Sequence, residues 1–331
     1  MEKHEDVASI LSMLDLHDIE ETISQPYHKT GPGKPPRSPL GIFKALVVKQ
    51  LRNIPSDREL YRRLWNDEAL REICDIEEYK KPYHPSQLTR FRNRVGPERL
   101  EAVMNSLLEE LVEGGIVKGE TLALDATFIK AWSRRDPADD NHGFSDPEAK
   151  VGRDGKTYDL GYKAHVAMDV ESDMPVAVVG ASANENEKKH VEELLGKAST
   201  VVERIKAVVA DPQYSSEKVR ICIHGHGAKP VIPYMSNQRG GEEVLRVDRC
   251  FRVSGPEEER RMYEVGRAAV ERVNSRLDSV GLDCLKLRGL RNAVVHVLLC
   301  VVMVLLVAVA ALRLGRPWKA RSLSSFWWLR S

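Results

Sequence analysis

The sequence predicts an α/β protein in which a mixed sheet flanked by helices follows an all-helical N-terminal domain. Two observations support this fold class. From Ile42 to about Val117 apolar residues recur about every 3.6 positions, which is typical of amphipathic helices. Near residue 120 the pattern changes to short alternating segments rich in β-formers, and strands then alternate with helices. With 331 residues, 42% of them hydrophobic, the chain can bury one large core or two smaller ones.

The first 40 residues are predicted to form an acidic tail and a connector. Residues 1–25 hold seven acidic residues and one lysine, and 4–22 have the mixed pattern of a surface helix. Residues 25–40 contain five prolines and two glycines, which favour an extended, solvated backbone. A helical domain is expected at 41–118, with helices around 41–53, 57–65, 67–73, 86–95 and 97–114.

A second domain is expected at 119–315, beginning with a strand at Thr121–Ile129. The polar stretch 133–156, with its repeated Asp and Gly, predicts a long mobile loop. An insertion is expected at about 234–260 and a basic tail at 316–331. The remaining predicted strands are 158–170, 175–181, 206–210 and 229–232, and the remaining helices are 187–195, 215–222, 262–278 and 292–312.

The last of these helices raises the question of a membrane. Ala293–Leu312 is almost unbroken Val, Leu, Ala and Met, which is long enough to cross a bilayer, and basic residues flank it. A helix buried in a protein core has the same composition and is favoured here. A membrane-tethered protein is the alternative. The N-terminus lacks an apolar signal core, so we expect an intracellular protein.

The five cysteines predict neither a disulfide framework nor zinc. They are odd in number, widely scattered and form no CxxC pair. Cys222-x-His224-x-His226 has a spacing that fits no standard zinc site, so a glycine-flanked turn is expected there.

Two aspartates stand in apolar strand context. Asp125 lies within a strand, and Asp211 directly follows the apolar run 208–210. A single aspartate at a strand end is usually a turn former or an ion-pair partner. Two on core strands would instead form a hard-oxygen site for Mg²⁺ or Mn²⁺, because buried carboxylates need such a partner. Glu271, from the late helix, could complete a site for two ions.

The late helix repeats charged and polar residues on one face. Tyr263, Arg267 and Glu271 are spaced by four residues, and Asp278 follows seven later. An Arg267–Glu271 ion pair on a solvated face is the simple interpretation. The apolar residues between them favour a helix packed on the core.

Four segments carry a resemblance to a known family. They are LDATFIKA, the hairpin-like SDPEAKVGRDGKTYDLGYKAHVAMD, ADPQYSS and RAAVERVNSRL. Over about residues 35–315 the chain resembles the DDE transposases of bacterial and archaeal insertion sequences, in the branch with a Tyr-Arg-Glu-Lys signature. The resemblance implies an RNase H-like catalytic core and an N-terminal DNA-binding domain. It also implies that Asp125, Asp211 and Glu271 are the catalytic carboxylates that hold two Mg²⁺ or Mn²⁺ ions.

The signature is not complete. Tyr263 and Arg267, which by resemblance hold terminal phosphates, are separated by three residues instead of two. Asp278 stands at the lysine position, and Arg276 is the nearest substitute. These departures leave open a catalytically decayed or domesticated derivative that binds DNA without cutting it.

The expected partner is DNA, both transposon terminal repeats and target. The net charge is only +1, which excludes a uniformly basic surface but not a basic face. Candidate DNA contacts, which could equally be solvated surface residues, are Lys163 and His165 on the hairpin and Arg90, Arg92 and Arg94 in the helix at 86–95. The expected activity is metal-dependent DNA cleavage and strand transfer. We expect a homodimer that acts at the nucleoid in the cytoplasm and does not bind a membrane.

Overall fold

The computed structural model describes residues 4–27, 36–77, 80–238, 244–248, 250 and 252–323. They form two compact units, 1–111 with 276–331, and 112–275. We call them the helical unit and the sheet unit. This division differs from the predicted boundaries at 41–118 and 119–315, because the C-terminal apolar helix packs with the N-terminal helices.

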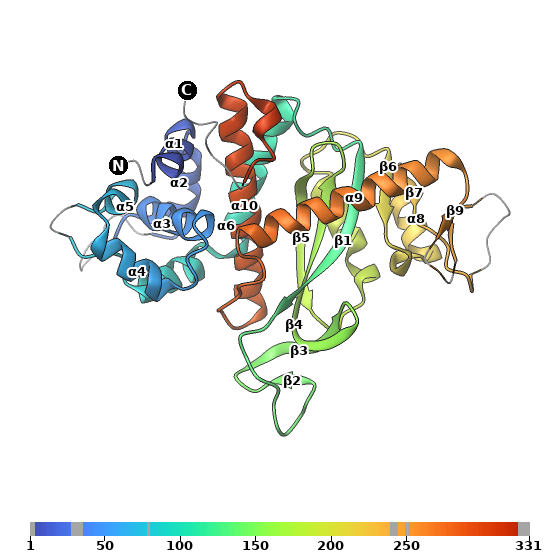
Figure 1. The fold of residues 1–331 in the computed structure, drawn as a ribbon, viewed down its shortest axis with the longest axis horizontal. Coiled ribbons are helices and arrows are strands. Elements are labelled where there is room, and N and C mark those ends of the chain that lie inside the picture. The colour runs from blue at the N-terminus through green and yellow to red at the C-terminus, as the bar shows by residue number, and fades with distance from the viewer. Residues whose placement is uncertain are drawn as a thin grey trace. The chain divides into compact units, whose positions relative to one another are not determined.

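The helical unit contains the predicted helices of the N-terminal half (Figure 1). Side chains at their first turns explain where three of them begin, because Ser38, Ser56 and Asp67 each accept a hydrogen bond from the backbone three residues later. Its helices are α1 (Glu5–Met13), α2 (His17–Ser24), α3 (Pro39–Leu51), α4 (Asp57–Asn66), α5 (Glu68–Ile73), α6 (Pro85–Glu113, up to residue 111), α10 (Leu290–Arg313) and the short η4 (Pro317–Lys319).

The predicted break between 95 and 97 is a kink inside α6. Gly96 has φ 70°, outside the helical region, and Pro97 follows it. A positive φ is rarely adopted by residues with a side chain, so the conformation at this point favours glycine.

The N-terminal residues are not the acidic tail that the composition predicted. Apolar side chains of α1 and α2 are buried, among them Val7, Ile10, Ile19 and Ile23. Helix α1 packs on α3 and α10, and α2 packs on α3. Asp18, Glu20 and Glu21 are exposed on the other face of α2, so composition alone hid an amphipathic helix. Residues 28–35 of the predicted connector and 324–331 of the predicted basic tail lie outside the described residues.

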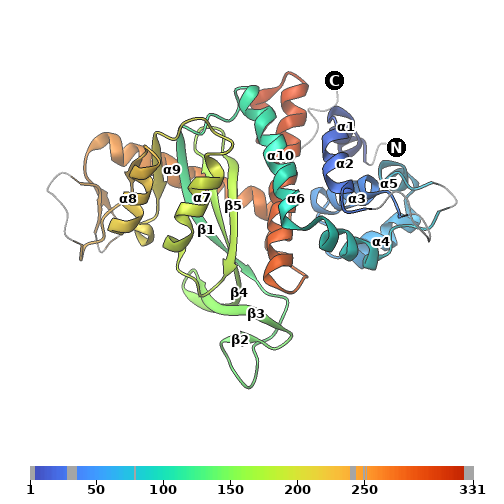
Figure 2. The same ribbon diagram turned by 180° about the vertical axis from the view of Figure 1, so that it is seen from behind.

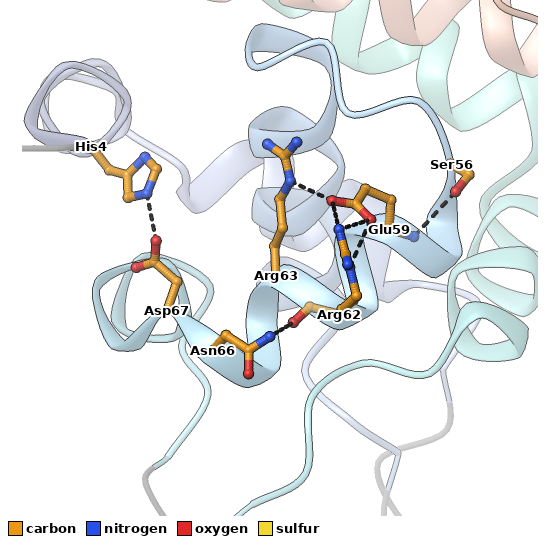
Figure 3. A network of polar contacts seen from close by, with 7 residues as sticks. All are labelled: His4, Ser56, Glu59, Arg62, Arg63, Asn66 and Asp67. Atoms are coloured by element: carbon orange, nitrogen blue, oxygen red, sulfur yellow. Dashed lines mark hydrogen bonds and ion pairs between the residues drawn. The ribbon is translucent and has the colours of Figure 1, made fainter.

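Polar contacts lie within α4 and at the residue that follows it (Figure 3). His4 Nε2 lies 2.9 Å from the Asp67 carboxylate. Glu59 accepts hydrogen bonds from the guanidinium groups of Arg62 and Arg63, both at 2.9 Å. Such exposed ion pairs contribute little to stability, so apolar burial holds this unit together.

Helix α10 belongs to the core of the helical unit. By length and composition it could cross a membrane, but 94% of its most apolar stretch is buried in the protein. The polar residues that interrupt it have protein partners. His296 Nε2 lies 3.0 Å from the Gly281 carbonyl oxygen. The side-chain amide nitrogen of Gln50, Nε2, donates to Cys300 Sγ at 3.3 Å. This burial confirms the core-helix interpretation.

The sheet unit is built on five principal strands, β1 (Thr121–Lys130), β4 (Thr157–Asp169), β5 (Met174–Ser182), β6 (Ala207–Ala210) and β7 (Lys229–Val231). They lie in the order β5-β4-β1-β6-β7. Strand β4 runs antiparallel to its neighbours, whereas β6 is parallel to β1 and to β7. This arrangement agrees with the RNase H-like sheet that the resemblance implies.

The prediction of a mobile loop over 133–156 is wrong for the second half of this stretch. It contains β2 (His142–Gly143) and β3 (Asp146–Asp154), and β3 pairs with β4 from Lys150–Gly161 to Asp154–Thr157. The Tyr162 hydroxyl donates to the Asp146 carboxylate at 2.8 Å. This hydrogen bond explains how Asp146 can be buried in the strand, away from solvent. The hairpin suggested by the resemblance is confirmed.

Helices cover both faces of the sheet (Figures 1 and 2). On one face lies α9 (Glu257–Ser279), and on the other lie α7 (Val191–Ala198) and α8 (Glu217–Gly225). Only the part of α9 up to residue 275 belongs to the sheet unit. Gly266 lets α9 approach the sheet, because a Cβ there would lie 2.7 Å from Val209. Arg272 fixes the helix further by donating to both Asp173 oxygens, at 2.9 and 2.7 Å.

Short elements complete the sheet unit. Two 3₁₀ turns, η2 (Glu187–His190) and η3 (Pro212–Tyr214), precede α7 and follow β6. The described part of the predicted insertion holds a small sheet of β8 (Arg246–Val247) and β9 (Val253–Ser254). Cys222 and His224 lie in helix α8, so the glycine-flanked turn expected there begins only at its end.

Candidate active site

Two carboxylates meet at the centre of the sheet. Strands β1 and β6 are parallel neighbours in which Leu124 pairs with Ala210, so Asp125 and Asp211 each follow a paired position. Both line one cavity of about 420 Å³ that opens to solvent. The Asp211 carboxylate also accepts a hydrogen bond from the Gln213 backbone at 2.8 Å, which begins η3. The sheet register therefore brings together two acids that are 86 residues apart in sequence.

Asp125 is held by side chains of α9. Arg267 Nη1 lies 3.3 Å from its Oδ1, and Asn274 Nδ2 donates to its Oδ2 at 3.0 Å. Thr127, two residues along β1, donates to the Asn274 oxygen at 2.9 Å and orients that amide. Burial raises the pKa of Asp125, Arg267 and Asn274 oppose that shift, and the negative charge of Asp211 adds to it.

The same face of α9 brings Tyr263 and Arg267 to the carboxylates. Burial lowers the pKa of Arg267, but attraction to Asp125 and Asp211 outweighs burial and the net shift is upward. Burial, followed by the charge of Asp211, raises the pKa of Tyr263 to about 12, so its hydroxyl keeps its proton. Both residues can present hydrogen-bond donors to an anion that enters the site.

Glu271 is not gathered with the two aspartates. Its side chain is exposed, and it is not among the residues that line the cavity. Among described residues, the three carboxylates do not form a cluster with ligand atoms within 4.8 Å of one another. Helical geometry gives the reason: Asn274 follows Arg267 by seven residues on the same face, whereas Glu271 is rotated from Arg267 by about 40°. Arg276 belongs to the helical unit, so its role stays a prediction.

The cavity is also lined by residues that the sequence did not single out, apart from Lys163. Lys163 Nζ pairs with Glu187 at 2.9 Å, and the Lys163 side chain is 11% exposed. Arg153, Asn186 and Lys188 also line the cavity. Nothing in the sequence marks Glu187, since it lies in a short polar turn. Asn274 could have been found from its seven-residue spacing to Arg267.

Two residues predicted to contact DNA are buried in the structure. His165 is fully buried in β4, with its ring 4.2 Å from that of His190, and burial lowers its pKa to about 3. Arg92 is 4% exposed and is bound by Asp57, whereas Arg90 and Arg94 are exposed on α6. Alternating strand faces and helix faces decided these outcomes, and charge alone did not reveal them.

Comparison with known proteins places the chain among the transposases. A family model for the transposase DDE domain matches residues 117–306, more than half of the chain, so the protein belongs to that family. A second model, for a transposase domain of the DUF772 type, matches residues 1–94. Membership of the Tyr-Arg-Glu-Lys branch stays a prediction. No protein among the curated ones matches.

Two solved structures show a weak likeness. A piggyBac transposase in a synaptic complex with hairpin DNA is 12% identical, with a TM-score of 0.47, over 99% of this chain and 78% of that chain. Mos1 transposase, in a paired-end complex with the left transposon end, is 13% identical, with a TM-score of 0.23, over 61% of each chain.

The donor set of the cavity suits a hard divalent cation. Asp125 and Asp211 offer carboxylate oxygens at one edge of the sheet, and such oxygens are the protein ligands that Mg²⁺ and Mn²⁺ prefer. The upward pKa shift of Asp125 shows that burial is not fully offset by Arg267 and Asn274. A cation at this position would relieve both the burial of Asp125 and its repulsion from Asp211.

Proposed function

We propose that this chain is an insertion-sequence transposase that binds transposon-end DNA and catalyses phosphodiester cleavage and strand transfer at the Asp125–Asp211 cavity. The carrying observation is the register of β1 and β6, which places both carboxylates on one cavity that Lys163 also lines. Arg267 pairs with Asp125 from α9. Membership of the DDE transposase family supplies the reaction class.

Asp125 and Asp211 would hold Mg²⁺ or Mn²⁺, and Glu271 would complete a site for two ions. When bound, such ions stabilise the attacking and leaving oxygens of an in-line displacement at phosphorus. The protein residues then bind and orient the DNA. Arg267, which neutralises Asp125 in this structure, would pair with a phosphate, and Tyr263 would donate its hydroxyl to the same backbone.

The identity of the third carboxylate is the point that most needs a test. Glu271 matches the family motif but is exposed in this structure, whereas Glu187 lines the cavity but has no motif behind it. We favour Glu271, because a rotation of α9 by about 40° would bring it to the face that Arg267 now occupies. That rotation would also free Arg267 to meet the phosphate.

DNA would contact both units. Arg90 and Arg94 are exposed on α6, and Lys163 lies at the cavity. Arg276 is a further candidate, since it stands two residues before Asp278. Joining two transposon ends requires two protomers, so a homodimer in the synaptic complex is part of the proposal, with its action at the nucleoid in the cytoplasm.

A decayed or domesticated DNA-binding derivative is the second candidate. Asp278 at the lysine position of the signature favours it, as does the ion pair that occupies Asp125. Such a protein would bind DNA through the same cations but would not cut it. Binding and cleavage therefore have to be measured separately.

The test is strand cleavage on DNA carrying the inverted repeats that flank the coding sequence, with Mg²⁺ or Mn²⁺. Asp125→Asn and Asp211→Asn should each lower cleavage by at least about 100-fold while binding remains, because each removes an ion ligand. Glu271→Gln should do the same, and Glu187→Gln is its matched control. Cleavage that survives both aspartate substitutions refutes the proposal, and binding without cleavage by the unaltered chain establishes the decayed derivative.

A further inference from the structure

A second cluster of potential metal ligands lies on the face of the sheet opposite α9. Glu192 lies in α7 and Cys222 lies in α8, and His226 directly follows the last residue of α8. One ligand atom from each residue lies within 4.8 Å of those of the other two. Helices α7 and α8 pack against each other, so the cluster joins neighbouring elements of one unit. It shares no residue with the carboxylate cavity.

The three ligand atoms are near enough to one another for a single metal ion to contact all of them. Cys222 Sγ donates to Glu192 Oε2 at 2.8 Å, and His226 Nε2 lies 3.6 Å from Glu192 Oε1. Zinc bonds of about 2.0–2.3 Å in tetrahedral geometry separate neighbouring ligand atoms by about 3.3–3.8 Å. The imidazole and carboxylate already satisfy this. The sulfur must move away from the carboxylate by less than about 1 Å.

Helical spacing explains why the sequence pattern was misleading. In Cys222-x-His224-x-His226 the pair that shares a helix face is the first and the last residue, which are four apart. His224 is exposed and stands about 200° around the helix from Cys222. The third ligand, Glu192, is 30 residues away in sequence and is brought in by the packing of α7 on α8.

The chemistry of the three donors selects the metal. A thiolate, an imidazole and a carboxylate are together typical of Zn²⁺, whereas Mg²⁺ and Ca²⁺ prefer oxygen alone. Burial, followed by the hydrogen bond to Glu192, raises the pKa of Cys222 to about 12, so the thiol keeps its proton when no metal is bound. An entering zinc ion would replace that proton on the sulfur and release it to solvent.

We propose that Glu192, Cys222 and His226 bind one Zn²⁺ ion, with water as the fourth ligand. The ion would tie α7 to α8. Because α8 follows η3, whose N-cap is Asp211, zinc would stabilise the segment that positions this carboxylate. The proposed zinc site does not depend on the proposed transposase activity.

The test uses the untagged full chain with Asp125→Asn, so that the carboxylate cavity is weakened as a competing metal site. Zn²⁺ is titrated against a chromophoric chelator, and Co²⁺ is used as a spectroscopic probe of thiolate coordination. We expect one tightly bound Zn²⁺ per chain and a sulfur-to-cobalt charge-transfer band. Cys222→Ser and His226→Asn should each weaken zinc binding by at least about 100-fold, since even outer-shell partners are worth about 10- to 100-fold.

Matched controls come from the same chain. His224→Asn changes an exposed histidine two residues from His226, and Cys250→Ser removes an exposed cysteine, so both should bind zinc unchanged. Circular dichroism confirms that each variant is folded. Absence of stoichiometric zinc, absence of the thiolate band, or equal affinity in the Cys222→Ser protein would each overturn the proposal.

Discussion

Asp57 holds two buried cations in the helical unit, and its removal should be among the most damaging single changes there. Its carboxylate accepts hydrogen bonds from Arg92 at 2.7 and 2.9 Å and lies 3.3 Å from Lys49 Nζ. The side chains of Arg92, Lys49 and Asp57 are 5%, 16% and 18% exposed. They come from α6, α3 and α4, so this cluster links three helices.

The expected loss can be worked out from this geometry. Asp57→Asn keeps the shape but leaves two cations in a poorly solvated site, which costs about 3–5 kcal/mol when one partner of a buried pair is removed. For a unit of this size that corresponds to a fall in Tm of about 6–20 °C. Arg90→Ala, on the exposed side of the same helix, should change stability by less than about 0.5 kcal/mol.

Chemical denaturation measured by circular dichroism provides the assay, with DNA affinity measured in parallel. The double variant Asp57→Leu/Arg92→Met should be more stable than Asp57→Asn, because apolar replacement of both partners leaves no unpaired charge. The reasoning is refuted if Asp57→Asn costs less than about 1 kcal/mol. It is also refuted if Arg92→Met leaves stability unchanged but weakens DNA binding, since Arg92 would then be the DNA contact that the sequence predicted.

The pH dependence of the same cluster follows from the pKa shift of Asp57. Burial acts to raise this pKa, but the hydrogen bonds and charge of Arg92, with Lys49, outweigh burial and lower it. The unfolded chain therefore binds a proton at higher pH than the folded one. The stabilisation is complete above the unfolded pKa of about 3.9 and is lost as pH falls through the folded value. Asp57→Asn should flatten the acid limb of the stability profile.

Three further predictions concern the sheet unit. Gly266→Ala should destabilise it by about 1–3 kcal/mol, measured by denaturation, and this cost should shrink in a Val209→Ala background, because the added Cβ meets that valine. His165 has a folded pKa of about 3 against 6.5 when unperturbed, so the unfolded state binds more protons between these two pH values. The free energy of unfolding therefore decreases as the pH is lowered from 6.5 towards 3. His165→Leu should remove a slope of up to about 1.4 kcal/mol per pH unit, and an unchanged slope would contradict this assignment. Arg267→Gln should raise the pKa of Asp125 further in a carboxyl NMR titration, because burial is then less opposed; a fall would show that the ion pair does not form in solution.

Secondary structure and family were largely accessible from the sequence. Apolar spacing predicted the helices at 41–53 and 57–65, and alternation predicted β1, because periodicity reports directly which face of an element is buried. The strand contexts of Asp125 and Asp211 pointed to a shared site, and the register of β1 and β6 agrees with that. Motif resemblance indicated the DDE transposases, to which the chain belongs.

Tertiary packing decided the roles of individual polar side chains. Arg90 and Arg92 lie two residues apart in one basic run, yet Arg90 is exposed and Arg92 is buried against Asp57. His165 looked like a surface residue until the sheet placed it in the core. Likewise, Glu192 reached Cys222 only because α7 packs on α8. A sequence records periodicity within an element, but which element covers which face is fixed by long-range contacts, and those contacts decide whether a charge meets solvent, a partner or an ion.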